Sequence, residues 1–272
     1  MHKMIEQIKY INHMNEVIEF GKDGIFVNEN DLHSFAWNIV NKNDKISSFK
    51  KGITKKTLPV TIKSANTAIK DRLYEVCEKD VIAKKHGKLI IGDYYLKCYI
   101  TGSKPSDYSL SKEYMKATLT VQTDFPQWVK ETTTSFNGSE ASAGKNLDFN
   151  NDFAYDYASN MLNKKLNNGD FVASNFRIRI FGVANTPEIN IGGHTYLVNV
   201  DIAKNEYLTI DSVEKTIFLT KADGSTVNCF NLRNRDEYIF EKIPSGTSEV
   251  STSGSFVFDI TLLEERGVPK WI

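Results

Sequence analysis

The sequence predicts a mainly β protein with one principal helix, organised in two domains. Three observations carry this prediction. Aliphatic, aromatic and threonine residues alternate with polar ones along most of the 272 residues, with turn residues between the runs. One segment alone has helical periodicity, and one polar stretch near the middle is almost free of aliphatic residues. A chain of this length forms one large domain or two ordinary ones.

Strands and the helix alternate in the first half. Residues 91–102 (IGDYYLKCYITG) and 116–123 (KATLTVQT) have apolar side chains at every second position, which gives each strand one apolar face. From about Asn66 to Lys85 the period changes. Apolar residues recur there at offsets 0, 4, 7, 8 and 12 and define one helix face: Ile69, Leu73, Val76, Cys77 and Val81. Gly87 supplies a stop signal, and we expect the helix to cover a sheet.

Residues 131–146 (ETTTSFNGSEASAGKN) mark the expected domain boundary, because small polar residues in such a run are typical of a linker. The charge changes at the same place. Residues 1–130 hold 21 basic against 15 acidic side chains (+6), and residues 131–272 hold 13 against 19 (−6). We therefore predict domains at 1–130 and 131–272, with the last residues packing back on the first domain.

The second domain reads as short strands at regular spacing with no helix. The strand patterns are NFRIRIFG, PEINIGGHTYLVNVDI, YLTIDS, KTIFLTKADGSTVNCF and SFVFDITLL. Gly192-Gly193 and Asp223-Gly224 lie where two-residue hairpin turns are expected. This pattern indicates a β-sandwich or a jelly roll.

No motif in the sequence indicates catalysis, a cofactor or a metal. P-loop, dinucleotide-binding, nucleophile-elbow and zinc-protease patterns are all missing from it. Cys77 and His86 could form a nucleophilic pair, but Cys77 falls on the apolar helix face, where a free cysteine is usually a small core residue. Asp148, Asn150 and Asp152 begin like a calcium loop, which then lacks the required glycine and glutamate. We predict a protein that is not an enzyme.

The N-terminal residues mix charges into every short apolar run, so they do not resemble a signal peptide. No stretch approaches the ~20 apolar residues of a membrane-spanning helix. The three cysteines are far apart in the sequence and odd in number, which fits free thiols made in a reducing cytoplasm.

Residues 42–56 form an expected basic loop with six lysines and one acid. Nucleic acid could bind it, but only Phe49 could stack on a base and the loop has no arginine. A solvated loop, or contact with an acidic neighbouring subunit, is favoured instead. The candidate assembly residues are Lys50, Lys51, Lys55 and Lys56.

The order of segments resembles the phage distal tail proteins, the family that forms the hub of siphophage baseplates. The similarity is in YINHMNEVIEFGKDGIFVNENDLHSFAW, in the helix followed by KLIIGDYYLKCYITG, in FAYDYASN and NFRIRIFGVANTPEINIGGHTYLVNV, and in YLTIDSVEKTIFL, NCFN and IPSGTSEVSTSGSFVFDITLLEERGVPKW. It spans nearly the whole chain, and its specificity lies in order and spacing.

The resemblance implies a ring-forming first domain, a β-sandwich with a helix and an extended hairpin, followed by a galectin-like β-sandwich. It implies a homo-hexameric ring that docks on the tail tube protein and carries a tail-associated hub or fibre protein, with DNA only as cargo through the lumen. The protein would lie in the virion tail after synthesis in the bacterial cytoplasm. The family has no catalytic residues or cofactors to carry over.

A carbohydrate-binding module is the competing interpretation, since galectin-like sandwiches can hold sugars on exposed aromatic rings. The only tryptophan beyond residue 131 is Trp271, and the His-x-Asn-x-Arg pattern of sugar-binding galectins is missing. Tyrosine rings could take the place of a tryptophan as the stacking surface, and the candidates are Tyr155, Tyr157, Tyr196, Tyr207 and Tyr238.

Overall fold

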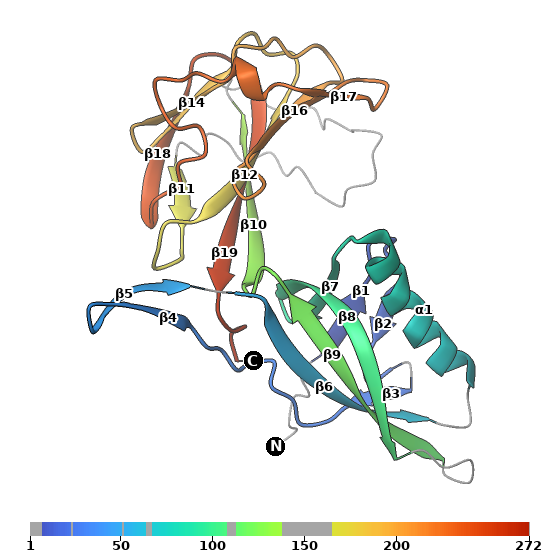
Figure 1. Ribbon diagram of the computed structural model, residues 1–272. Coiled ribbons are helices and arrows are strands. Elements are labelled where there is room, and N and C mark those ends of the chain that lie inside the picture. The colour runs from blue at the N-terminus through green and yellow to red at the C-terminus, as the bar shows by residue number, and fades with distance from the viewer. Residues whose placement is uncertain are drawn as a thin grey trace, which may run out of the picture. The chain divides into compact units, whose positions relative to one another are not determined.

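The computed structural model describes residues 7–22, 24–50, 52–63, 67–107, 113–137 and 165–271 (Figure 1). The chain forms two compact units. Unit 1 contains residues 1–130 and 265–272, and unit 2 contains residues 131–264. The protein is mainly β, and α1 (Thr67–Ala83) is the one α-helix in the described part of the chain, which confirms the expected fold class.

Antiparallel strands form the body of unit 1. Along one direction β8 (Tyr94–Asp107) pairs through its first half with β7 (Gly87–Ile91), and then follow β1 (Ile8–Ile11) and β2 (Val17–Glu19). Through its second half β8 pairs with β9 (Tyr114–Thr123), followed by β6 (Thr54–Lys63) and β3 (Ile25–Val27). Strict alternation of buried residues along β6 and β9 gives the apolar face that the sequence predicts.

Helix α1 covers part of this core with one face. The buried helix residues are Leu73, Val76, Cys77 and Asp80, a spacing of three and four residues. Val81 was expected on this face and is exposed, so that assignment is wrong. The preceding residue, Asp80, is buried instead of Val81. Its burial is possible because the Tyr10 hydroxyl of β1 and the His13 N–H of the following turn donate to its carboxyl oxygens.

The helix ends earlier than the glycine signal suggested. Lys84 has a positive φ of 53°, its N–H donates to the carbonyl of Val81, and the N–H of Lys85 donates to the carbonyl of Asp80. These two bonds close the helix end without a glycine. Gly87 is not the stop signal. It begins β7 and is buried against Tyr10, whose hydroxyl oxygen would lie 2.4 Å from a Cβ at that position.

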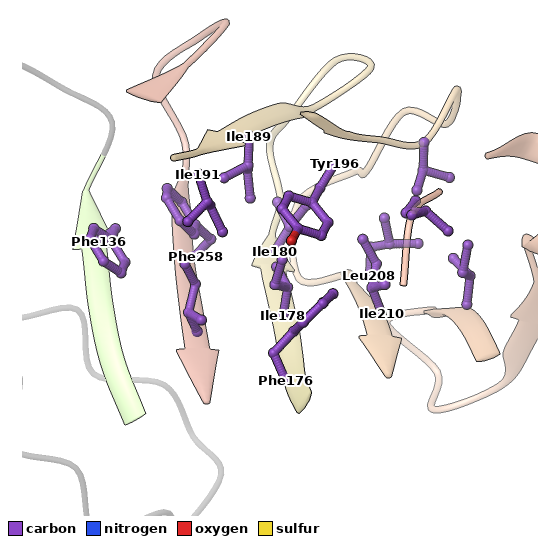
Figure 2. Close-up of a cluster of buried hydrophobic side chains, with 14 of the residues drawn as sticks. Phe136, Phe176, Ile178, Ile180, Ile189, Ile191, Tyr196, Leu208, Ile210 and Phe258 are labelled. Atoms are coloured by element: carbon purple, nitrogen blue, oxygen red, sulfur yellow. The ribbon is translucent and has the colours of Figure 1, made fainter. Parts of the chain in front are cut away.

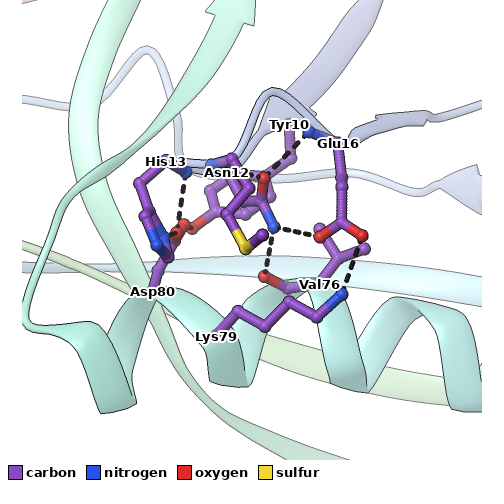
Figure 3. Close-up of polar contacts among 8 residues, drawn as sticks. Tyr10, Asn12, His13, Glu16, Val76, Lys79 and Asp80 are labelled. Carbon is purple, nitrogen blue, oxygen red and sulfur yellow. Dashed lines mark hydrogen bonds and ion pairs between the residues drawn. The ribbon is translucent and has the colours of Figure 1, made fainter.

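A polar cluster joins the helix to β1 and the turn after it (Figure 3). The carboxyl group of Asp80, which is completely buried, accepts a 2.5 Å hydrogen bond from the Tyr10 hydroxyl. It also accepts one of 2.8 Å from the backbone N–H of His13, whose Nδ1 lies 2.6 Å from the same oxygen. Burial, together with the bond to Asp80, raises the pKa of the Tyr10 phenol.

Glu16 makes the second half of this cluster at the protein surface. Its carboxylate accepts hydrogen bonds of 2.7 Å from Lys79 of α1 and 2.6 Å from the side chain of Asn12. These two bonds lower the pKa of Glu16. Asn12 also donates to the carbonyl of Val76, so the β1–β2 turn is fixed to the helix at three points.

Unit 2 is a β-sandwich. One sheet has the order β17 (Thr226–Asn228), β16 (Thr216–Thr220), β15 (Tyr207–Asp211), β12 (Asn175–Phe181), β19 (Val257–Arg266) and β10 (Trp128–Asn137). The other has the order β11 (Lys165–Asn168), β18 (Gly246–Thr252), β13 (Glu188–Ile191) and β14 (His194–Leu197). The short 3₁₀ helix η1 (Phe230–Leu232) follows β17.

The inner faces of the two sheets share one core (Figure 2). Phe176, Ile178 and Ile180 of β12 point toward Ile189 and Tyr196 of the opposite sheet, and all five side chains are buried. The alternating residues of β12 face outward, as the period-two pattern of NFRIRIF requires.

Two details of unit 2 differ from expectation. Residues 131–137 of the expected linker belong to strand β10, in which Phe136 is buried and Thr133 bonds to Thr261 of β19. Threonine is polar but favours strands, which explains why residues 131–137 were expected to be part of a linker. Gly192-Gly193 forms the expected two-residue turn between Ile191 and His194. Asp223-Gly224 does not form one, because Thr220 pairs with Thr226 and five residues connect β16 to β17.

Candidate assembly surface

Residues 38–50 of unit 1 form a two-stranded hairpin, β4 (Asn38–Lys42) and β5 (Lys45–Lys50). Figure 1 shows it extending away from the other strands of its unit. Asn43 and Asp44 connect the strands with φ values of 51° and 56°, which is the two-residue turn that suits the twist of a hairpin. Within the described residues these strands pair only with each other.

One face of this hairpin is apolar. The register places Ile39 opposite Phe49 and Asn41 opposite Ile46, with an irregularity after Val40. Residues that are opposite or two apart share a face, so four side chains come together. The members of this apolar face, with their exposed fractions, are Trp37 (48%), Ile39 (55%), Ile46 (57%) and Phe49 (58%).

Exposure of this kind indicates a contact surface. A lone two-stranded hairpin is marginally stable in water and usually needs something packed against its apolar face. Trp37 and Phe49 touch edge to face with ring centroids 6.3 Å apart, which orders the face but does not bury it. Clustered exposed apolar side chains on a folded protein mark sites of protein association.

This face was not predicted from the sequence. The lysines of residues 42–56 led to the expectation of a loop, in which Phe49 was only a possible base-stacking ring, whereas strands β5 and β6 occupy most of this segment. The signal that could have found the face is the pair of turn-forming residues Asn43 and Asp44, with WNIV before them and KISSF after them.

The four candidate lysines have different surroundings. Lys50 ends β5, Lys51 lies outside the described residues, and Lys55 is exposed on β6. Lys56 is buried, with 5% of its surface exposed, so its assignment to an outer contact surface is wrong. Its ammonium group instead donates to backbone carbonyls of the loop before the hairpin, an arrangement that no residue pattern reveals.

Cys77 and His86, which were considered as a nucleophilic pair, each make contacts of a structural kind. Cys77 is buried in the core as expected, and burial raises the pKa of its thiol to about 12. His86 contacts Asp124, its Nε2 lying 3.0 Å from the carboxylate. Among the described residues no group of His, Cys, Asp and Glu side chains could hold a metal ion. Asp148, Asn150 and Asp152 lie outside the described residues.

In the described part of the chain, no helix combines the length and apolar character needed to cross a membrane.

The five tyrosines considered as sugar platforms have different surroundings. Tyr196 is buried, and the Arg179 guanidinium lies over the ring of Tyr207 at 5.2 Å. Tyr155 and Tyr157 lie outside the described residues, and Tyr238 is 56% exposed. A depression of about 810 Å³ lies on the smaller sheet of unit 2, and none of the described residues that line it is aromatic. Among the described members of these five tyrosines, Tyr238 is the exposed ring that a sugar could stack on.

The fold is that of phage tail hub proteins, as comparison with solved structures shows. The Dit protein of phage SPP1, described as a paradigm of the hub adsorption apparatus in phages infecting Gram-positive bacteria, matches with a TM-score of 0.61 at 10% identity. The match covers 96% of this chain and 99% of that chain. The resemblance to distal tail proteins that the sequence indicated is thus confirmed at the level of the fold.

Two baseplate structures of phage P2 also match. The baseplate in its activated conformation with Ca gives a TM-score of 0.61 at 12% identity, covering 98% of this chain and 100% of that chain. The corresponding structure with Sr gives 0.60 at 12% identity, with coverage of 97% and 100%. A scan against protein-family models and a search of curated proteins find no match.

Proposed function

We propose that this chain is a structural protein of a phage tail, which assembles into a homo-hexameric ring at the distal end of the tail tube and joins the tube to the baseplate. The observation that carries the proposal is the exposed apolar face of hairpin β4–β5 in a chain with the fold of tail hub proteins. In this proposal the protein is not an enzyme, and it functions through the surfaces that it presents.

Unit 1 is the assembling part. A closed ring requires each protomer to present two different surfaces, one to each neighbour. The hairpin face is one such surface, since burying a large apolar side chain stabilises an interface by about 1.5–3 kcal/mol. Isolated from a neighbour, Ile39 and Phe49 leave more than half of their surface in water.

The remaining partners follow from the proposed position in the tail. One side of the ring contacts the tail tube protein and the other carries a tail-associated hub or fibre protein, while DNA passes through the lumen only as cargo. Unit 2 is the galectin-like β-sandwich in this proposal. The protein is made in the bacterial cytoplasm and ends in the virion tail.

Exposed lysines strengthen the contact between protomers or with the tube. Residues 1–130 carry an excess of six positive charges, and Lys55 is exposed near the base of the hairpin. Exposed ion pairs contribute little individually and are screened by salt, so they bias the contact without determining it.

Sedimentation velocity of the full chain, alone and with the cognate tube protein, tests the proposal. The wild type should sediment as a ring. Replacing both Ile39 and Phe49 with Ser should weaken association at least tenfold, because about 1.4 kcal/mol changes an equilibrium constant tenfold and two apolar anchors are removed. A Phe171→Ser/Val172→Ser variant is the matched control, since it removes two exposed apolar side chains from unit 2.

The outcomes separate the parts of the proposal. A wild type that stays monomeric in every condition, including with the tube protein, refutes the ring. A ring that the Ile39/Phe49 variant still forms with wild-type affinity refutes the role of the hairpin. Charge reversal of Lys50, Lys51 and Lys55 to Glu, compared at low and high salt, tests the lysines by themselves.

A further inference from the structure

The loop that precedes hairpin β4–β5 is fixed from the inside by Lys56. The Lys56 ammonium donates hydrogen bonds to the backbone carbonyls of Asp31 and Leu32, both at 3.2 Å, and of Ser34 at 2.5 Å. The Leu32 side chain is completely buried in the core of unit 1. An ammonium has three donors, and here the carbonyls of one loop satisfy all of them.

The same loop is covered from the outside by residues 267–271. The indole ring of Trp271 stacks on the imidazole ring of His33, with ring centroids 3.8 Å apart and planes within 9° of parallel. A Cβ built on Gly267 would lie 3.5 Å from the Cβ of Phe35, so residue 267 lies beside the Phe35 side chain. Thus two residues of the loop, His33 and Phe35, meet a segment more than 230 residues further along the chain.

The hairpin begins directly after this contact. His33 and Asn38, the first residue of β4, are five positions apart. Trp37, the first member of the apolar face, lies between them. Because the hairpin pairs with no other strand in the described part of the chain, its direction depends on its two connections to the rest of unit 1, one of which is the loop from which it starts.

We infer that Trp271 is a positioning residue for the assembly hairpin: stacked on His33, it holds the loop against Lys56 and thereby sets where the apolar face of β4–β5 points. The effect on assembly rests on the proposed function, but the contact by which Trp271 holds the loop, called the clasp below, lies within a single chain. No role in the core explains Trp271, since 79% of its surface is exposed.

Exposure also makes the inference testable without unfolding the protein. Replacing an exposed side chain seldom changes the free energy of unfolding by more than about 0.5 kcal/mol, so Trp271→Ala should fold as the wild type does. Trp271→Phe keeps a flat ring that can stack on His33 and serves as the conservative variant. Phe171→Ala, which removes an equally exposed aromatic ring from unit 2, is the matched control.

Amide hydrogen exchange of the full chain tests the clasp directly. The N–H groups of Leu32 and Ser34 are hydrogen-bonded, to the side chain of Asn30 and the carbonyl of Asp31 respectively. In Trp271→Ala these amides should exchange roughly two- to tenfold faster, the range that the energy of an aromatic pair allows. Trp271→Phe and Phe171→Ala should leave their exchange near the wild-type rate.

Sedimentation of the same variants tests the consequence. Trp271→Ala should associate more weakly than the wild type, and Trp271→Phe should restore association. If the exchange rates in Trp271→Ala equal those of the wild type, Trp271 does not hold the loop, whether or not the wild type assembles. If exchange is faster but assembly is unchanged, Trp271 does not position the hairpin for assembly. If the wild type never assembles, the ring is refuted, and the exchange rates still decide whether Trp271 holds the loop.

Discussion

The hydroxyl of Tyr10 donates a 2.5 Å hydrogen bond to the carboxyl group of Asp80, a residue 70 positions further along the chain. This bond joins the first described strand of unit 1 to helix α1, and both side chains are completely buried. A buried carboxyl group is tolerated only where donors satisfy it. Asp80 meets that condition through Tyr10 and the backbone N–H of His13.

Removing this carboxyl group should destabilise unit 1. Asp80→Ala leaves the Tyr10 hydroxyl and the His13 N–H without their acceptor, and we expect a loss of about 3–5 kcal/mol in the free energy of unfolding. Urea unfolding monitored by circular dichroism measures it. Glu78→Ala, on the exposed face of the same helix, should change stability by less than about 0.5 kcal/mol. Equal losses in the two variants would argue against a structural role for the buried bond.

Tyr10 should also make stability depend on alkaline pH. Its folded-state pKa is raised by burial and by the bond to Asp80, so the folded chain keeps a proton that the unfolded chain releases above about pH 10. The stabilising contribution is complete below that pH and decreases as pH rises further, by up to ~1.4 kcal/mol per pH unit.

The measurement is the urea-unfolding free energy at roughly pH 9 and pH 11. Tyr10→Phe should lose less stability between these two pH values than the wild type loses. Tyr238→Phe, in which the replaced ring is exposed, should retain the wild-type slope. The interpretation fails if both variants have the same slope.

Gly87 should be intolerant of any side chain. A Cβ there would lie 2.4 Å from both the Asp80 carboxyl and the Tyr10 hydroxyl, distances that real Cβ atoms do not show. Gly87→Ala should therefore destabilise by about 1–3 kcal/mol, with a larger loss if the hydrogen bond breaks. Gly102→Ala is the matched control, because a Cβ on this β8 residue meets its nearest neighbour at 3.9 Å. Thermal unfolding of the two variants compares them.

The sequence predicted the elements whose burial follows a simple period. Strands with alternating patterns and the apolar face of α1 through Leu73, Val76 and Cys77 have the expected form. Val81 was misassigned because a hydropathy pattern cannot show that Asp80 finds buried donors. Residues 131–137 were misassigned because threonine is polar in composition and strand-forming in conformation.

The candidate site was predicted only in part. The lysines of residues 42–56 led to the prediction that this segment takes part in assembly. The apolar face of the same segment was not predicted, because its composition is dominated by charged residues. The burial of Lys56 depends on carbonyls about 25 residues earlier in the chain, and the stacking of Trp271 on His33 depends on a far longer separation. Contacts of this kind arise from tertiary structure and have no local pattern.

The apolar face of α1 provides the last prediction. Leu73 is completely buried at the centre of that face, whereas Glu75 lies two positions further on the exposed side. Leu73→Ala removes buried methyl groups and leaves a cavity, which should cost about 2–5 kcal/mol. Glu75→Ala should cost less than about 0.5 kcal/mol, because alanine is a strong helix former and no buried contact is removed. Urea unfolding of both variants measures the difference, and similar losses would show that the helix packs through another face.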